Sequence, residues 1–330
     1  METYYKTNKL FFHNPSSILV YAVDPGAWAM LSKVASFLIS KGLNVRYLFE
    51  GWAKTNASKS ISLQNICTME ELPFLEEHGK TLIIYGAQQN FKKNYAFVSL
   101  CRKHEYKTMF VFDSWKNYLI NFVNYEDNCL YLPDKIAVAD SLMKNCIKDS
   151  LSGHAPENYI EEIGIIGHLP LIDSVNYIKA LTQKYKTALQ EKYNPDKKQL
   201  ILFIMEPIRM DFIETNNINP GYDEYTIFTR FLNKYCSCND KVLVKAHPRQ
   251  NIDDISVFIS KLHSTLCEVE IVKDDKIENL IAIADKVYGM TSIALNVSIE
   301  SGKEVHSIQH GRNSYGESLS NPWLEAVLER

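Results

Sequence analysis

The stretch SILVYAVDPG at residues 17–26 decides the fold class. Its β-branched and apolar residues form a nearly continuous run that a Pro-Gly pair ends, which predicts a buried strand over residues 17–24. Residues 27–41 follow with apolar side chains at helical spacing and end near Gly42, which predicts a helix. A second strand is predicted at 44–49. A strand, a helix and a strand in this order indicate a βαβ unit with parallel strands.

The same alternation continues to the C-terminal region. The first half contains further predicted strands at 81–85, 108–112, 135–139 and within 161–170, and helices near 90–104 and 115–123. A polar helix is predicted at about 174–193. The second half contains predicted strands at 199–205, 241–246, 268–272, 285–288 and 304–308, and helices near 223–235, 252–264, 275–284 and 291–301. The pattern predicts an α/β protein with two Rossmann-like domains, 1–173 and 174–330.

Composition excludes several classes of protein. The 330 residues include 36 Lys and Arg against 39 Asp and Glu, a formal net charge of −3, and 46% are hydrophobic. These values are typical of a globular protein and exclude a disordered chain, a collagen-like repeat or a small disulfide scaffold. A nucleic-acid binder usually carries a basic excess, so we expect no nucleic-acid partner.

The cellular compartment is predicted from absent signals. No apolar run approaches the ~20 residues that span a bilayer, and the first residues lack a signal-peptide pattern. The seven cysteines are scattered without a CxxC pair or a zinc-like Cys/His spacing. We therefore expect free thiols in a cytoplasmic protein. Lysines 184, 186, 192, 197 and 198 leave two interpretations open: peripheral contact with anionic lipid at the inner membrane, or a solvated helix face.

Carboxylates and tryptophans follow the predicted strands of the first half. In open α/β sheets, ligands bind outside the carboxyl ends of the strands. Flat aromatic faces beside hydrogen-bonding carboxylates suit a sugar ring, whereas the alternative is that the tryptophans simply plug the top of the sheet. The residues at these positions are Asp24, Trp28, Glu50, Trp52, Asp113 and Trp115.

Two turns in the second half predict a phosphate site. A predicted strand runs into a cationic turn that contains Lys245, His247, Pro248 and Arg249. A later strand ends at Gly289, after which Thr291 and Ser292 open a helix. Hydroxyls, backbone N–H groups and a helix N-terminus together attract anions. Each feature also has a structural interpretation, as an ordinary histidine or an ordinary helix cap, but their occurrence in successive βα units favours phosphate binding.

Several well-known motifs are missing from the sequence. There is no GxGxxG, no GxxxxGK[ST], no HExxH and no GxSxG. No Asp-x-Asp follows a strand as in metal-bound sugar-nucleotide sites. These absences argue against NAD binding, P-loop chemistry, zinc hydrolysis and an α/β-hydrolase, and we expect neither a metal site nor a cofactor.

The motifs resemble a known family. VKAHPRQ at 244–250 and ADKVYGMTSIALNVSIESGKEVHSIQHG at 284–311 resemble the C-terminal half of bacterial GT-B glycosyltransferases of surface-polysaccharide synthesis. The pattern is similar to the sialyltransferase, polysialyltransferase and Kdo-transferase group. In the first half, MFVFDSWKNYLINF and IEEIGIIGHLPLID resemble the acceptor domain and its exit to the linker. The resemblance implies two Rossmann-like domains whose parallel sheets face a central cleft, an acceptor domain first and a donor domain second.

The resemblance also implies roles for residues. A CMP-linked acidic sugar would be the donor, and a glycan or glycolipid the acceptor. His247 would contact the donor phosphate or protonate the leaving group, Thr291 and Ser292 would bind the phosphate, and Lys245 and Arg249 would add positive charge. The family's base lies in an Asp/Glu-Asp/Glu-Gly motif, of which Phe49-Glu50-Gly51 keeps the second acid and the glycine. Asp113-Ser114 has the position at a strand end without the glycine. We rank Asp113 first as the base, then Glu50, then Asp24.

Two further residues follow from the positions of the strands. Glu206 stands at the first strand end of the second half and is a candidate for binding the nucleotide or its sugar. His310, beside a glycine past the last strand, is a candidate donor contact. Trp28, Trp52 and Trp115 are the candidate acceptor contacts.

Three rival functions share these features. A CDP-polyol phosphotransferase would also use a His-Pro turn, and an enzyme like UDP-GlcNAc 2-epimerase would place acids and bases around a UDP-sugar. A non-catalytic glycan-binding or scaffold protein is the rival from another class. Binding of CMP, CDP or UDP, detected as a raised melting temperature, discriminates among them.

Overall fold

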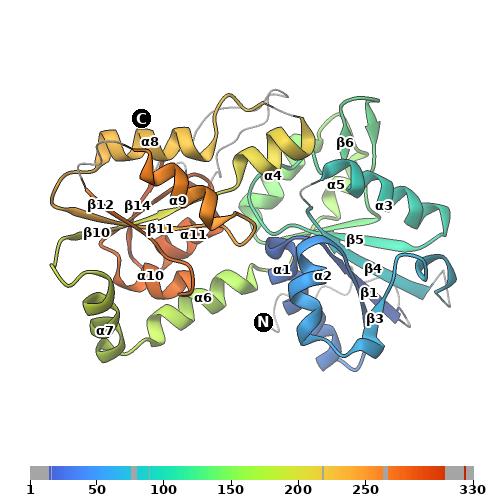
Figure 1. Ribbon diagram of the computed structural model, residues 1–330. Coiled ribbons are helices and arrows are strands. Elements are labelled where there is room, and N and C mark those ends of the chain that lie inside the picture. The colour runs from blue at the N-terminus through green and yellow to red at the C-terminus, as the bar shows by residue number, and fades with distance from the viewer. Residues whose placement is uncertain are drawn as a thin grey trace. The chain divides into compact units, whose positions relative to one another are not determined.

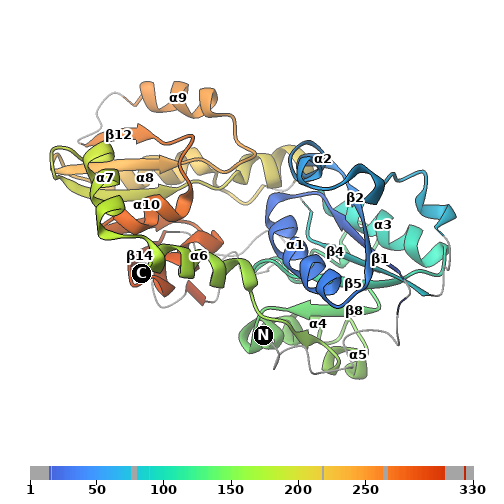
Figure 2. The ribbon, with the colours of Figure 1, turned by 90° about the horizontal axis from the view of Figure 1, so that it is seen from below.

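The computed structural model describes residues 15, 17–75, 80–88, 90–217, 219–262, 267–308 and 323–324. The chain divides into two units, Met1–Pro170 and Leu171–Arg330, whose border lies three residues before the predicted one. Each unit contains its own parallel sheet with helices on both faces (Figures 1 and 2). The predicted α/β class with two Rossmann-like domains is confirmed.

The sheet of unit 1 has seven strands in the order β3-β2-β1-β4-β5-β8-β9, all parallel. These strands are β1 (Ser17–Ala22), β2 (Asn44–Phe49), β3 (Ile66–Cys67), β4 (Thr81–Gly86), β5 (Lys107–Val111), β8 (Lys135–Val138) and β9 (Gly164–Ile165). The chain builds outward from β1 to β3 and then returns to the other side of β1, so the topological switch point lies between β1 and β4. A short antiparallel pair, β6 (Val123–Asn124) and β7 (Cys129–Leu130), stands apart from this sheet.

Helices cover both faces of this sheet (Figure 1). They are α1 (Pro25–Ser40), α2 (Gly51–Asn56), α3 (Phe91–Lys103), α4 (Ser141–Leu151) and α5 (Glu157–Glu161), with 3₁₀ turns at Ala57–Ser60, Leu63–Asn65 and Leu72–Phe74. Because side chains alternate along a strand, Ile18 and Val20 pack with Met30 and Leu31 of α1. Tyr21 points to the other face, where its ring lies 4.0 Å from that of Phe97 on α3.

The sheet of unit 2 has five parallel strands in the order β12-β11-β10-β13-β14. Its strands are β10 (Gln199–Ile204), β11 (Asp240–Lys245), β12 (Glu268–Ile271), β13 (Lys286–Gly289) and β14 (Glu304–Ser307). Its helices are α6 (Leu169–Ala180), α7 (Gln183–Tyr193), α8 (Glu224–Tyr235), α9 (Ile252–Ser260), α10 (Ile277–Ile283) and α11 (Ile293–Glu300), with a π-helix at Arg209–Glu214. The switch point lies between β10 and β13.

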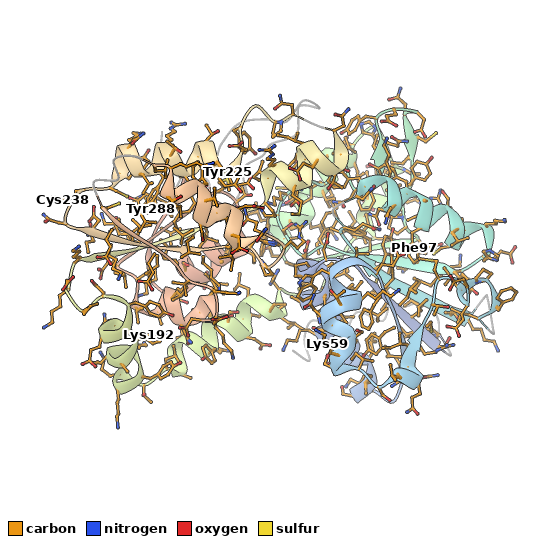
Figure 3. The ribbon with its side chains drawn as sticks, viewed as in Figure 1. Lys59, Phe97, Lys192, Tyr225, Cys238 and Tyr288 are labelled. Carbon is orange, nitrogen blue, oxygen red and sulfur yellow. The ribbon has the colours of Figure 1, made fainter. Side chains whose placement is uncertain are left out.

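An aromatic cluster fills the core of unit 2 under α8. Phe203 of β10 packs against Phe228 and Phe231 of α8, and Phe231 also packs against Tyr288 of β13. Figure 3 shows Tyr288 inside this unit and Cys238 at its periphery, where the thiol is exposed. All seven cysteines are free thiols.

Some predicted elements differ from the structure. The helix predicted at 115–123 is wrong: this stretch is a series of turns, in which Asn117 adopts a left-handed conformation with φ of 59°. The single helix predicted at 174–193 is two helices, because Thr182 accepts a hydrogen bond from the Tyr185 N–H and so begins α7 as its cap. Helices α4 and α5 were not among the predicted elements.

Candidate functional site

In unit 1, Asp113 lies just past the end of β5, within reach of the first turn of α1. An added Cβ on Gly26, at the start of α1, would lie 2.4 Å from Asp113 Oδ2. An added Cβ on Gly86, at the end of β4, would lie 2.8 Å from the Ala27 Cβ. Two glycines therefore allow the start of α1 to pass close over β4 and meet the Asp113 carboxyl group.

The surroundings of Asp113 change its protonation. Burial raises the pKa of the Asp113 carboxyl above its ordinary 3.8. The neighbouring His168 donates from Nε2 to the backbone oxygen of Asp113 at 2.9 Å, and burial lowers the pKa of its imidazole. A carboxyl group that holds its proton more tightly is a stronger base once ionised, so Asp113 stays a candidate for the general base.

The structure corrects the role predicted for Trp115. Its side chain is only 2% exposed, so it offers no open face to a sugar. The indole instead stacks on His168, with ring centroids 5.3 Å apart, and donates from Nε1 to Asp140 Oδ2 at 2.9 Å. Asp140 also caps α4 through the Met143 N–H. Trp115 therefore fixes the imidazole that contacts Asp113.

The other two acids occupy neighbouring strand ends. Glu50 precedes α2 and accepts a hydrogen bond of 2.5 Å from the Tyr21 hydroxyl. Burial raises the pKa of Tyr21, so its phenol stays protonated and keeps donating to Glu50. Asp24 precedes α1, and its backbone oxygen accepts the Trp28 N–H at 2.9 Å. The structure thus groups Asp113 with Gly26 and His168, and Glu50 with Tyr21.

Trp28 and Trp52 are only partly buried, so they do not simply plug the top of the sheet. Both pack against the core on the α1 face of the sheet. The Trp28 ring meets that of Phe49 edge-on, with 5.2 Å between centroids. Part of each indole remains exposed, so these two tryptophans stay candidates for acceptor binding.

In unit 2, three candidate residues follow the ends of three neighbouring strands at the same offset. Ile204 of β10 pairs with Lys245 on one side and with Gly289 on the other. Glu206, His247 and Thr291 each follow this row by two residues. Because β10 lies between β11 and β13, Glu206 follows the strand between the two strands that lead into the predicted phosphate-binding turns. The row lies at the switch point, where ligands of open α/β sheets bind.

Glu206 occupies the place predicted for a phosphate at Thr291. Its carboxylate accepts the Thr291 N–H at 2.5 Å on Oε1 and the Thr291 hydroxyl at 2.9 Å on Oε2, and its residue is 6% exposed. We therefore correct the role of Thr291, whose donors face an internal anion. Ser292 caps α11, accepting the Ala294 N–H at 3.3 Å, and is half-buried. Gly289 packs closely, since its added Cβ would lie 3.2 Å from the Ile204 oxygen.

The turn at His247-Pro248-Arg249-Gln250 fixes the imidazole. The Gln250 N–H donates to the His247 oxygen at 2.9 Å, and Gln250 Oε1 accepts the His247 N–H at 2.9 Å. The Arg249 N–H donates to His247 Nδ1 at 3.2 Å. Because Nδ1 accepts, the neutral imidazole carries its proton on Nε2 and presents a donor there.

The two predicted cations have partners within the chain. Arg249 forms a bidentate pair with Asp211, with N–O distances of 2.5 and 2.8 Å. Lys245 Nζ donates to the backbone oxygens of Lys273 and Asp275 at 2.8 and 2.7 Å, and burial lowers its pKa. The structure therefore corrects both roles: Lys245 anchors the segment after β12, and the charge of Arg249 is balanced by Asp211.

Sequence reasoning missed two residues that support the turn. Glu224, at the start of α8, is 4% exposed. Its carboxylate accepts the Arg209 N–H at 2.9 Å and Gln250 Nε2 at 3.3 Å, and burial raises its pKa. Asp211, which pairs with Arg249, lies on the π-helix, and no pattern in the sequence predicts that element. His310 lies outside the described residues.

Neither a cluster of metal ligands nor a membrane-spanning helix occurs among the described residues. No group of three or more His, Cys, Asp and Glu side chains gathers as metal ligands would in this part of the chain. Across the same residues, no helix has the length and apolar character that crossing a membrane requires.

Comparison with known proteins supports the fold. No protein-family model matches the chain, and no curated protein matches its sequence. Among solved structures, a co-structure of S. aureus MnaA with UDP covers 96% of this chain and 84% of its own, with a TM-score of 0.62 and 12% identity. The Neisseria meningitidis UDP-GlcNAc 2-epimerase bound to UDP-GlcNAc covers 88% and 82%, with a TM-score of 0.56 and 13% identity.

A third similar structure is a variant of the wall teichoic acid polymerase TagF. It covers 89% of this chain and 70% of its own, with a TM-score of 0.50 and 12% identity. Identities this low show the fold alone, and the fold is that of the GT-B class, with two Rossmann-like domains.

Proposed function

We propose that this protein is a glycosyltransferase that moves a sugar from a nucleotide-activated donor onto a glycan or glycolipid. The donor we favour is a CMP-linked acidic sugar of the sialic acid or Kdo kind. The observation that carries the proposal is the turn that fixes the His247 imidazole, just past the end of β11 and beside the switch point of unit 2, in a chain of the GT-B fold. Unit 2 would bind the donor and unit 1 the acceptor.

On the donor side, His247 is the central residue. Its Nε2–H would donate to an oxygen of the donor phosphate, because Nδ1 is already an acceptor. A hydrogen bond there stabilises the charge that develops on the leaving phosphate, and the imidazole can pass its proton to it. Ser292 at the start of α11 would add a hydroxyl, and Glu206 would meet the nucleotide's own hydroxyl groups.

On the acceptor side, Asp113 would be the general base. An acceptor hydroxyl would give its proton to the Asp113 carboxylate as its oxygen bonds to the anomeric carbon of the donor sugar. The bond between that carbon and the phosphate oxygen breaks, and the nucleoside monophosphate leaves with the electron pair. A carboxylate beside the sugar also stabilises the positive charge of the oxocarbenium-like transition state.

Mass-spectrometric detection of nucleotide release tests the proposal. Purified protein is incubated with CMP-sialic acid, CMP-Kdo, CDP-glycerol or UDP-GlcNAc and a mixture of saccharide acceptors. We expect CMP release with formation of a new glycoside, lost in Asp113→Asn and in His247→Ala. CMP release from CDP-glycerol with a phosphopolyol product would assign the phosphotransferase activity instead, and no turnover of any donor would favour a scaffold protein.

A second candidate is an enzyme like UDP-GlcNAc 2-epimerase. The observation that favours it is that two of the similar structures, one with UDP and one with UDP-GlcNAc, cover most of this chain at TM-scores above 0.5. Proton NMR of UDP-GlcNAc incubated with the protein would separate the two functions. An epimerase inverts C2 of the sugar, whereas the proposed transferase leaves C2 unchanged.

A further inference from the structure

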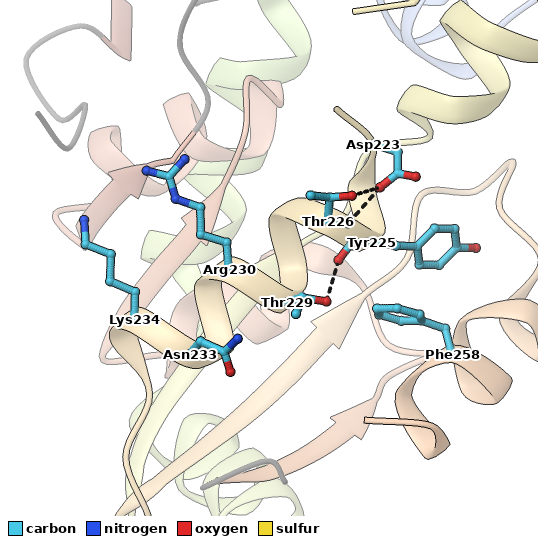
Figure 4. A pocket seen from close by; sticks show the side chains of 8 residues that line it. All are labelled: Asp223, Tyr225, Thr226, Thr229, Arg230, Asn233, Lys234 and Phe258. Atoms are coloured by element: carbon cyan, nitrogen blue, oxygen red, sulfur yellow. Dashed lines mark hydrogen bonds between the residues drawn. The ribbon is translucent and has the colours of Figure 1, made fainter. Parts of the chain in front are cut away.

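A surface groove follows helix α8 in unit 2, outside the residues assigned to the reaction (Figure 4). Its volume is about 720 Å³, and one side chain of α9, Phe258, contributes to a lining that otherwise comes from α8 and its cap. Small-molecule sites commonly have volumes of about 300–1,000 Å³, so the groove is large enough for an oligosaccharide segment.

The two ends of the groove have different chemistry. At one end, the ring centroids of Tyr225 and Phe258 lie 4.6 Å apart. Burial and the nearby negative charges of Glu224 and Asp254 raise the pKa of the Tyr225 hydroxyl. At the other end, Arg230 and Lys234 extend from the same side of α8, one turn apart (Figure 4). The groove therefore offers aromatic surface and the Asp223 carboxylate at its start, and positive charge at its end.

The side chains of Lys234 and Arg230 differ in the contacts that they make. Lys234 Nζ donates to the Tyr235 hydroxyl at 2.6 Å and lies over that ring. The exposed side chain of Arg230 has no hydrogen bond or ion pair with any residue that the structure describes. Its planar guanidinium suits a carboxylate, to which it can donate two parallel hydrogen bonds.

The groove begins beside the turn that holds His247. Asp223 caps α8 through the Thr226 N–H, and the next residue, Glu224, accepts a hydrogen bond from Gln250, which in turn fixes His247. At 1.5 Å per residue, the eleven steps from Asp223 to Lys234 span about 16 Å. A chain lying in the groove would thus extend away from the donor side of the site.

We propose that this groove binds a segment of an acidic glycan, with a carboxylate on Arg230 and Lys234 and an uncharged sugar face on Tyr225 and Phe258. The inference rests on the proposed function, because an enzyme that adds acidic sugars makes a product that carries carboxylates. Charge complementarity and the aromatic end favour this occupant. Nucleic acid is the less favoured polyanion, since the chain as a whole carries a net charge of −3.

Titration calorimetry with defined probes tests the groove. The probes are a hexamer of α2,8-linked sialic acid, the neutral maltohexaose and a thymidine hexanucleotide. We expect the sialic acid hexamer to bind best, and Arg230→Glu with Lys234→Glu to weaken its binding at least tenfold without changing the melting temperature. Lys184→Glu, an exposed lysine on α7, is the matched control and should bind as the wild type does.

Three results would overturn the inference: no binding of the sialic acid hexamer, equal binding by the double variant, or equal binding of the hexanucleotide. Release of CMP from CMP-sialic acid with a monosaccharide acceptor is measured on the same variants. Retained release with lost hexamer binding is the expected pattern. Hexamer binding without any donor turnover would contradict the proposed function but not the groove.

Discussion

The carboxyl-end edges of the two sheets share a topology but differ in how their polar groups are used. In both units the chain turns back between the first strand and its later neighbour, β1 and β4 or β10 and β13. In unit 1, burial leaves Asp113 with a raised proton affinity. In unit 2, the predicted anion-binding groups Thr291 and Arg249 are bonded to carboxylates of the same chain. One edge therefore holds a buried acid with a raised pKa, whereas two of the predicted anion-binding groups at the other edge are bonded to carboxylates within the chain.

Removal of the Asp113 carboxyl group should have the largest effect, a loss of sugar transfer. We expect Asp113→Asn to lower transfer about 100- to 10,000-fold, the range for loss of a general base. Nucleotide binding, measured as a thermal shift, should stay unchanged because unit 2 is untouched. The matched control is Asp149→Asn, an exposed acid on α4, which should transfer at the wild-type rate. Full activity in Asp113→Asn would show that another group is the base.

Displacement of the same carboxyl without removing it should have the next largest effect. In Gly26→Ala, the new methyl would lie 2.4 Å from Asp113 Oδ2, so the carboxyl must rotate. We expect transfer to fall by about tenfold or more, since a misplaced base loses the geometry of proton transfer. Ser36→Ala, on the exposed side of α1, is the control. Unchanged transfer in Gly26→Ala would mean that the position of the carboxyl does not matter.

Because Glu206 and Thr291 are hydrogen-bonded to each other inside unit 2, replacement of Thr291 should lower the stability of the protein. Thr291→Val keeps the side-chain shape but leaves Glu206 Oε2 without its 2.9 Å donor. A buried polar group that loses a partner costs about 1–3 kcal/mol, so the free energy of unfolding in urea should fall by that amount. Thr55→Val, at an exposed position on α2, should change it by less than about 0.5 kcal/mol. Equal stability of the two variants would contradict the Glu206–Thr291 contact.

The smallest expected effect concerns pH and His168. Because burial lowers the pKa of its imidazole from the ordinary 6.5, the folded state binds this proton less readily than the unfolded state. Stability should therefore fall as pH drops below 6.5 towards the folded pKa. His168→Gln keeps an amide donor for the Asp113 oxygen but does not titrate, so its stability should vary less over this pH range. Parallel pH–stability curves would contradict the buried, neutral imidazole.

The fold was largely predictable, because in both halves of the sequence apolar runs typical of buried strands alternate with segments of helical periodicity. The positions of Asp113, Glu206, His247 and Thr291 were also predictable, since each directly follows a strand. What those side chains bond to was not predictable. Lys245 and Arg249 were assigned to a phosphate on their charge alone, and only the folded chain brings the Lys273 oxygen and Asp211 to them.

Other features depend on contacts between residues far apart in the sequence. Trp115 stacks on His168 and bonds to Asp140, and no local spacing predicts that pairing. In the turns that replace the predicted helix at 115–123, the backbone oxygens of Ile120 and Val123 accept hydrogen bonds from the distant Tyr95 hydroxyl. The proximity of Gly26 to Asp113 likewise arises from the path of α1 over β4, which is a property of the packed sheet.

Nucleotide binding measured by titration calorimetry tests the central claim most directly. The wild type, His247→Ala and Asp113→Asn are each titrated with CMP, CDP and UDP. We expect the wild type and Asp113→Asn to bind one of these nucleotides with similar affinity, and His247→Ala to bind it at least tenfold more weakly. Absence of binding to all three nucleotides, or equal binding by His247→Ala, would contradict a donor site at the β10–β11–β13 edge.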